Sequence, residues 1–113
     1  MMTILHNPRC GKSRQCLAFL EENNKEFTII KYLENPLTFE EIKKLLAKLK
    51  LTPIELVRQK ESIWVEHFKS KNLTDTEIIQ TLAENPILIE RPIVIDGDNA
   101  YIARDENMLK NLI

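Results

Sequence analysis

Apolar residues along this chain of 113 residues fall into short continuous runs and helical spacings, with Asn-Pro pairs between several of them. The apolar run Met2–Leu5 is typical of a buried strand. A helix is expected over residues 17–24, where Leu17 and Leu20 share one helical face. Residues 26–33, which include Phe and Ile, predict a second strand. A strand, a helix and a strand in this order predict a parallel pair joined by a right-handed crossover.

The middle of the chain carries mainly helix signals. Two Thr-x-x-Glu capping boxes, at residues 38–41 and 74–77, predict helix starts. The hydrophobic periodicity extends these helices to about residues 49 and 84. One or two further helices are expected within residues 53–70.

The end of the chain returns to strand signals. Residues 93–95 are apolar, residues 96–99 form a turn, and residues 100–103 are the returning strand of a hairpin. Asp105 can cap a short final helix. The order βαβ, helices, hairpin and helix predicts an α/β fold. It describes a thioredoxin-like sandwich with a four-stranded mixed sheet and an all-helical insertion at about residues 37–84.

Composition places the chain among soluble globular proteins. It is 43% hydrophobic and 29% charged, and its length allows one core in a single domain over residues 1–113. The formal net charge of −1 gives no reason to expect a nucleic-acid or membrane partner. The N-terminal residues lack the apolar run of a signal peptide, and no segment approaches the roughly 20 apolar residues of a membrane span. We therefore expect a cytoplasmic protein.

Cys10 stands where a thiol should lose its proton most easily. It lies at the mouth of the expected first helix, among Arg9, Lys12 and Arg14. Unpaired N–H groups at a helix N-terminus and nearby cations stabilise a thiolate, and they also bind oxyanions. A free cysteine is often only a small buried apolar residue, but three flanking cations resist burial. The sequence therefore favours a cysteine nucleophile that acts on an anionic substrate or beside one.

Cys16 and His6 are weaker candidates. If residues 10–16 are mostly helical, the two cysteines lie about 9 Å apart along the axis, whereas a disulfide needs Cα atoms within about 7 Å. No Cys-x-x-Cys pair is present, so Cys16 is expected in the core. His6 is either a buried residue at a strand end or a cation that stabilises the thiolate, and spacing does not choose between the two.

Three arginines could surround an oxyanion. Taken singly, Arg58, Arg91 and Arg104 are each expected to be solvated surface residues. Arg91, however, directly precedes Pro92 at the start of an apolar strand, and Arg104 follows the returning strand of the hairpin, so these two could lie close together. Guanidinium groups bind tetrahedral oxyanions in bidentate fashion, so a converging set would suit such a substrate.

Four separated segments carry a family resemblance: residues 6–14, 32–36, 56–58 and 86–94. They resemble the glutaredoxin-coupled arsenate reductases of the ArsC/Spx family, and especially its compact chromosomal members. The segments match in the right order and span nearly the whole chain.

The resemblance implies a reaction and its partners. In this family a nucleophilic cysteine attacks the arsenic of arsenate, glutathione then displaces arsenite, and glutaredoxin reduces the resulting mixed disulfide. The resemblance therefore implies arsenate or a similar oxyanion as substrate and glutathione as co-substrate. No bound cofactor or metal is expected, and a monomer is expected.

The resemblance also assigns roles to residues. Cys10 matches the nucleophile, and His6 matches the histidine that helps to keep it ionised. Pro92 matches the cis-proline that faces the cysteine loop, and Ser13 is expected to have a structural role at the site. Three arginines match those that hold the oxyanion: Arg58, Arg91 and Arg104.

Two other functions stay open on the sequence alone. A glutathione-dependent oxidoreductase could use the same thiol on another small oxidant or mixed disulfide. A redox regulator of the Spx type would bind RNA polymerase, but such regulators use a Cys-x-x-Cys switch, and here Ser13 occupies the second cysteine position.

Overall fold

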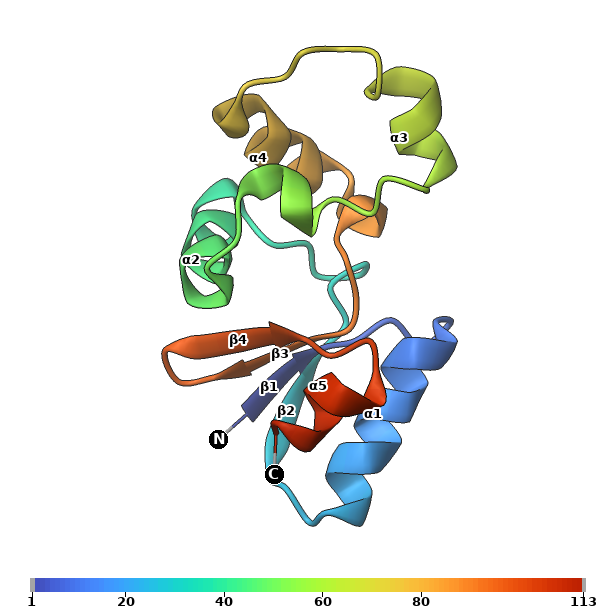
Figure 1. Ribbon diagram of the computed structural model, residues 1–113, viewed down its shortest axis with the longest axis vertical. Coiled ribbons are helices and arrows are strands. Elements are labelled where there is room, and N and C mark those ends of the chain that lie inside the picture. The colour runs from blue at the N-terminus through green and yellow to red at the C-terminus, as the bar shows by residue number, and fades with distance from the viewer. Residues whose placement is uncertain (1, 113) are drawn as a thin grey trace. The chain divides into compact units, whose positions relative to one another are not determined.

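The computed structural model describes residues 2–112, apart from the side chain of Glu106. The chain divides into two compact units, which we describe separately. The first unit joins Met1–Asn35 to Arg91–Ile113, and the second unit is Pro36–Glu90 (Figure 1). The prediction of a single domain over residues 1–113 stays a prediction.

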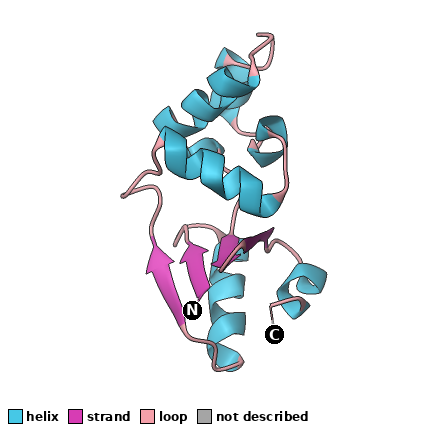
Figure 2. Cartoon of the chain, turned by 90° about the vertical axis from the view of Figure 1, so that its left-hand side faces the viewer, coloured by secondary structure: helices cyan, strands magenta, loops and turns pink. Residues whose placement is uncertain are grey.

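The first unit is built on a four-stranded mixed sheet (Figure 2). β1 pairs in parallel with β2 and antiparallel with β3, and β3 and β4 form the antiparallel hairpin. The strand order is β2-β1-β3-β4, which confirms the predicted four-stranded mixed sheet. The strands are β1 (Met2–Leu5), β2 (Phe27–Ile30), β3 (Ile93–Asp96) and β4 (Asn99–Ile102).

Helix α1 (Gly11–Glu22) connects β1 to β2 and begins earlier than its apolar pattern predicts. The prediction placed its start at Leu17, because the first turn and a half is polar and shows no hydrophobic period. In the structure Lys12 and Arg14 are exposed on this part of the helix while Ser13 is buried. The helix start that the apolar pattern predicted was therefore wrong, whereas the prediction that Cys10 stands at the mouth of the helix is confirmed, because Cys10 is the N-cap residue.

Strand β2 is shorter than predicted, ending at Ile30 rather than at residue 33. The chain then turns, and the N–H groups of Glu34 and Asn35 both donate to the carbonyl of Lys31. The hairpin between β3 and β4 turns at Gly97, whose φ of 62° lies in the region that glycine enters most easily.

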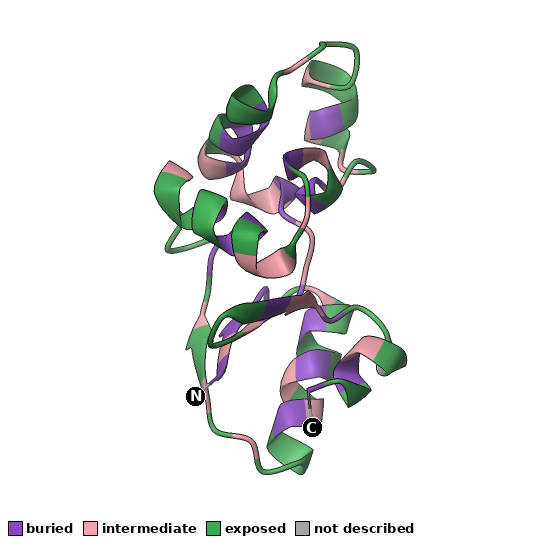
Figure 3. Cartoon of the chain, turned by 60° about the vertical axis from the view of Figure 1, so that its left-hand side comes forward, coloured by how far each residue is buried: buried purple, intermediate pink, exposed green. Residues whose placement is uncertain are grey.

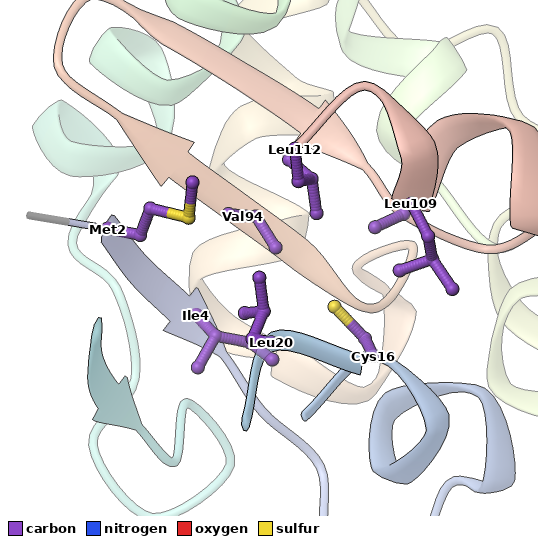
Figure 4. Packing of buried hydrophobic residues seen from close by; sticks show 8 residues of the cluster. Met2, Ile4, Cys16, Leu20, Val94, Leu109 and Leu112 are labelled. Carbon is purple, nitrogen blue, oxygen red and sulfur yellow. The ribbon is translucent and has the colours of Figure 1, made fainter. Parts of the chain in front are cut away.

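The core of the first unit joins the sheet to α1 and α5 (Glu106–Lys110) (Figure 4). The Cys16 side chain points into this cluster and is fully buried, which confirms its predicted place in the core. Asp105 caps α5 by accepting a hydrogen bond from the N–H of Met108 at 2.9 Å, as predicted. The other buried members of the cluster are Met2, Ile4, Leu20, Val94, Ala103, Leu109 and Leu112.

The second unit is helical, with buried and exposed faces on its longer helices (Figure 3). Both predicted capping boxes are present: the Thr38 and Thr74 hydroxyls accept from the N–H groups of Glu41 and Glu77, each at 3.2 Å. Helix α2 contacts α4 across apolar faces. The elements are α2 (Phe39–Leu49), η1 (Pro53–Leu56), α3 (Ser62–His67), α4 (Asp75–Glu84) and η2 (Pro86–Leu88). Across residues 2–112, no helix combines the length and the apolar character that crossing a bilayer requires.

Candidate active site at one edge of the sheet

The ends of all four strands meet at one edge of the sheet in the first unit. The register pairs Leu5, at the end of β1, with Ile30 at the end of β2 and with Ile93 at the start of β3. Ile93 pairs in turn with Ile102 at the end of β4. The segments that follow β1, β2 and β4, and the segment that precedes β3, therefore all leave the sheet at this edge. In α/β sheets, ligands bind at the carboxyl ends of the parallel strands.

Hydrogen bonds beyond the strands continue this alignment. The N–H of His6 donates to the carbonyl of Ile30 at 2.8 Å, which holds the start of the cysteine loop beside the end of β2. The N–H of Ala103 donates to the carbonyl of Pro92 at 2.9 Å. This second bond keeps the segment of Arg91 beside that of Arg104. The predicted proximity of these two arginine positions is thus present in the backbone.

Asn7 organises the loop that leads to Cys10. Its side-chain oxygen accepts from the N–H of Arg9, and its carbonyl accepts from the N–H of Cys10, both at 3.0 Å. The Arg14 guanidinium donates to the carbonyl of Pro8 at 3.0 Å, so α1 also holds the loop from its own first turn. Asn7 is buried, and within the resembling segment of residues 6–14 it was not selected as a site residue. The loop therefore fixes Cys10 at the N-terminus of α1.

The Cys10 thiol is half-buried, and its pKa lies below the ordinary value of a cysteine. Burial alone would raise the pKa, but several groups that stabilise the thiolate outweigh it. These are the backbone N–H groups of Ser13 and Lys12 and the side chain of Arg91, which contributes both a hydrogen bond and its positive charge. Helix N–H groups thus stabilise the thiolate as expected, but the contributing side-chain charge is that of Arg91 and not those of Arg9, Lys12 or Arg14. The role of Cys10 as a nucleophile stays a prediction.

His6 is buried and bonded to Ser13. The distance between His6 Nδ1 and Ser13 Oγ is 2.7 Å, and Ser13 Oγ also accepts from the N–H of Asn7 at 3.0 Å. Burial lowers the pKa of His6, and the positive charges of Lys31 and Arg14 lower it further. The imidazole is therefore neutral near neutral pH. The cationic alternative for His6 is disfavoured, and the buried alternative at the strand end agrees with the geometry.

Arg91 and Pro92 lie at the start of β3. The peptide bond between them is cis, Pro92 is fully buried, and Arg91 is half-buried. Arg104 lies just beyond the end of β4 and is exposed. Two guanidinium groups thus belong to the same edge of the sheet as the Cys10 loop.

Arg58 belongs to the second unit. Its backbone N–H donates to the carbonyl of Leu88, and its Nε lies 3.6 Å from a carboxylate oxygen of Glu61. Both side chains are partly exposed, so this ion pair contributes little stability. The assignment of Arg58 to the substrate site stays a prediction.

Tyr32 is a residue of this edge that sequence reasoning did not select. It follows β2, its side chain is 1% exposed, and its pKa is raised to about 12 because burial disfavours the phenolate. The Arg91 guanidinium lies near enough to oppose that shift, and the negative charge of a Cys10 thiolate would reinforce it. The available signal was positional: Tyr32 follows a strand expected to run parallel to β1, so its segment had to emerge beside the cysteine loop.

A thiol at a helix N-terminus, on the edge of a four-stranded mixed sheet flanked by arginines, defines a thioredoxin-like protein with a reactive cysteine. The chain belongs to the ArsC family, whose family model matches residues 5–112. The matched region includes every residue discussed above at the sheet edge.

Individual relatives agree with this assignment. The chain is 38% identical over 112 residues to the uncharacterized protein YfgD of Escherichia coli K12, covering 97% of this chain and 94% of that one. It is 36% identical over 103 residues to an arsenate reductase of Neisseria meningitidis serogroup A, covering 89% and 88%. The structure of an arsenate reductase from Vibrio cholerae superposes with a TM-score of 0.89 at 38% identity, covering 96% of this chain and 95% of that one. The predicted fold class is confirmed.

Proposed function

We propose that this protein is an arsenate reductase of the glutathione and glutaredoxin type, acting as a monomer in the cytoplasm. The observation that carries the proposal is the Cys10 thiol, whose pKa is lowered by N–H groups of α1 and by Arg91. Relatives named arsenate reductase, at 36% and 38% identity over most of the chain, support arsenate as the oxyanion.

In the first step the Cys10 thiolate attacks arsenic(V) of dihydrogen arsenate. A sulfur–arsenic bond forms, an arsenic–oxygen bond breaks, and the leaving oxygen departs as water after taking up protons. Arg91 and Arg104 stabilise the negative charge on the remaining oxygens, because guanidinium groups form charge-assisted hydrogen bonds to such anions. We include Arg58 as a third such residue on the strength of the sequence resemblance.

In the second step a glutathione thiolate attacks the Cys10 sulfur. A sulfur–sulfur bond forms, the sulfur–arsenic bond breaks, and its electron pair stays on arsenic, which leaves as arsenite. Arsenic gains two electrons, and the two thiols become one disulfide. Glutaredoxin then reduces this mixed disulfide by thiol–disulfide exchange.

The need for an outside thiol follows from the state of Cys16. Its side chain is fully buried in the core, and burial raises its pKa to about 11. A protonated thiol is a poor nucleophile, so Cys16 is unsuited to resolve an intermediate on Cys10.

His6 and Ser13 support the nucleophile by position rather than by charge. The Ser13 N–H is one of the groups that stabilise the thiolate, and the Ser13 hydroxyl is fixed by His6 and by the N–H of Asn7. In the tautomer with its proton on Nε2, a neutral imidazole accepts a hydrogen bond from the Ser13 hydroxyl at Nδ1. This arrangement keeps the first turn of α1 aligned on the Cys10 sulfur.

The test is arsenate-dependent oxidation of NADPH in the presence of glutathione, glutaredoxin and glutathione reductase. Wild-type protein should turn over, Cys10→Ser should be inactive, and the matched control Cys16→Ala should stay active. Turnover by Cys10→Ser would contradict the mechanism. If the protein instead reduces a low-molecular-weight disulfide and shows no arsenate-dependent turnover, the general glutathione-dependent oxidoreductase is the better assignment.

A further inference from the structure

The Tyr32 hydroxyl is a buried polar atom that the reaction described above does not use. Its oxygen has no hydrogen-bond partner of standard geometry among the described residues, and the residue is 1% exposed. Buried polar groups in native proteins are nearly always hydrogen-bonded, and those that are not often belong to functional sites. A phenylalanine would fill the same space without this cost.

The position of Tyr32 is set by the sheet. β2 runs parallel to β1, and the bond from the His6 N–H to the Ile30 carbonyl carries this alignment past the strand ends. Tyr32 comes two residues after Ile30, beside the loop of Asn7 and Cys10. The Arg91 and Asn7 side chains lie where they can donate toward the Tyr32 oxygen, and both oppose the rise that burial causes in its pKa, while the charge of a Cys10 thiolate reinforces that rise. These contacts use the oxygen as an acceptor, so the O–H proton still lacks an acceptor of standard geometry among the described residues.

We propose that the Tyr32 hydroxyl donates a hydrogen bond to an oxygen of the oxyanion that binds beside Cys10 and Arg91. This inference rests on the proposed function, because it takes an oxyanion as the ligand of the site. The Tyr32 hydroxyl would be a neutral hydrogen-bond donor beside the charged guanidinium groups that bind the same oxyanion. Tyr32 is then a substrate-binding residue whose acceptor arrives with the substrate.

The phenol is suited to this role because it keeps its proton. Burial raises its pKa to about 12, so the phenol keeps its proton at neutral pH. A neutral O–H donor adds no charge to the thiolate side of the site. Its contribution is therefore realised when an oxygen acceptor is bound, and it leaves the free thiol largely unaffected.

The experiment measures how well an oxyanion protects Cys10 from alkylation by iodoacetamide. Two probes are used: arsenate, and sulfate as a tetrahedral oxyanion that the thiol does not reduce. For Tyr32→Phe we expect the concentration that halves the alkylation rate to rise about tenfold for both anions, which is the usual effect of losing a hydrogen bond to a charged group. The matched control is Tyr101→Phe, which alters a half-buried tyrosine on β4 and should leave protection unchanged.

Two further measurements distinguish substrate binding from a structural role. Without any anion, the alkylation rate of Tyr32→Phe and its dependence on pH should match those of wild type. Its melting temperature should not fall, because the hydroxyl proton has no acceptor of standard geometry among the described residues. If Tyr32→Phe were alkylated more slowly without anion, or had a lower melting temperature, the hydroxyl would act by stabilising the thiolate or the fold. Either result would overturn the inference.

The outcomes separate this inference from the proposed function. If arsenate turnover is present but Tyr32→Phe is protected as well as wild type, the inference fails and the proposed function stands. If sulfate protection is weakened by Tyr32→Phe but arsenate is not turned over, the oxyanion contact stands and the arsenate assignment fails. If neither anion protects the wild-type thiol, both fail.

Discussion

At the scale of single residues, the two cysteines show how position decides chemistry. Cys10 is the N-cap residue of α1, and Cys16 lies within the same helix. The pKa of the Cys10 thiol is nevertheless lowered, whereas that of the Cys16 thiol is raised to about 11. The difference arises because Cys10 faces free helix N–H groups and Arg91, whereas Cys16 faces apolar side chains. The sequence predicted the core position of Cys16 from a local apolar period, and it predicted a helix N-terminus at Cys10. The flanking charges of Arg9, Lys12 and Arg14 on which the prediction for Cys10 also relied are not among the groups that lower its pKa, whereas the distant Arg91 is.

Removing Arg91 should make the Cys10 thiol less acidic. Arg91 lowers the pKa of this thiol through a hydrogen bond and through its charge, so Arg91→Ala should raise it and slow alkylation several-fold at pH 7. The measurement is the rate of iodoacetamide labelling as a function of pH. Arg9→Ala is the matched control, because Arg9 is adjacent in sequence but is not among the groups that shift the thiol. An unchanged profile for Arg91→Ala would remove Arg91 from the thiol's environment.

His6 should make the folded protein sensitive to mild acid. Its pKa is lowered below 6.5 on folding, so in the window just below pH 6.5 the unfolded chain binds a proton that the folded chain does not. Acidification therefore favours unfolding, and this contribution to stability is regained as the pH rises above 6.5. His6→Asn, whose amide can still face Ser13, should lose less melting temperature than wild type between pH 7.5 and pH 5.5.

The control for that prediction is His67→Asn. His67 is exposed in the second unit, and its side chain is 66% accessible. This variant should show the same loss of melting temperature as wild type. An equal loss in His6→Asn would show that another group is responsible for the acid sensitivity.

At the scale of elements, helices with side-chain caps were predicted better than the helix that carries the cysteine. The starts of α2 and α4 follow from Thr and Glu at fixed spacing, a signal that is complete within four residues. Helix α1 has no side-chain cap at Cys10 and a polar first turn, so its pattern became visible only at Leu17. The first N–H groups of α1 are available to the thiol because no side chain caps them. Without a capping residue, the sequence also carries no local signal of where this helix begins.

The cap of α4 should contribute measurably to stability. Thr74→Ala removes the hydroxyl that accepts from the N–H of Glu77, and we expect the free energy of unfolding to fall by about 1 kcal/mol. Unfolding in urea measures the change. Thr76→Ala, within the first turn of the same helix, should change stability by less than about 0.5 kcal/mol. Equal losses in the two variants would contradict a specific role for the cap.

At the scale of the whole molecule, the sequence predicted the parallel pair, the hairpin and a four-stranded mixed sheet, but not the strand order or every group at the sheet edge. The antiparallel pairing of β1 with β3 comes from the structure, and the pairing within the hairpin places the segment of Arg91 beside that of Arg104. Asn7 and Tyr32 were missed because each has an ordinary local context, and their importance arises only from segments distant in sequence. The neutral state of His6 likewise depends on burial and on Lys31, which pattern reasoning does not supply.

Arg58 should contribute to arsenate turnover, as the family resemblance implies. Arg58→Ala should lower kcat/KM for arsenate about tenfold by removing a charge-assisted contact. The pKa of Cys10 should stay unchanged, because Arg58 is not among the groups that shift it. Lys60→Ala, a change of an exposed cation close by in sequence, is the control for general loss of charge. Unchanged kinetics for Arg58→Ala would remove Arg58 from the oxyanion-binding residues.

The meeting of four strand ends has a consequence for how such a protein can diversify. Each strand delivers one or two groups just outside the ladder: His6 and Asn7, Tyr32, Arg91, and Arg104. Substitutions at these exits leave the pairing of the strands intact, but Arg91 also shifts the pKa of Tyr32 and of Cys10, so its replacement retunes both groups. Substrate preference can therefore be re-engineered on an unaltered sheet while Cys10 is kept, with Arg91 and Tyr32 exchanged together.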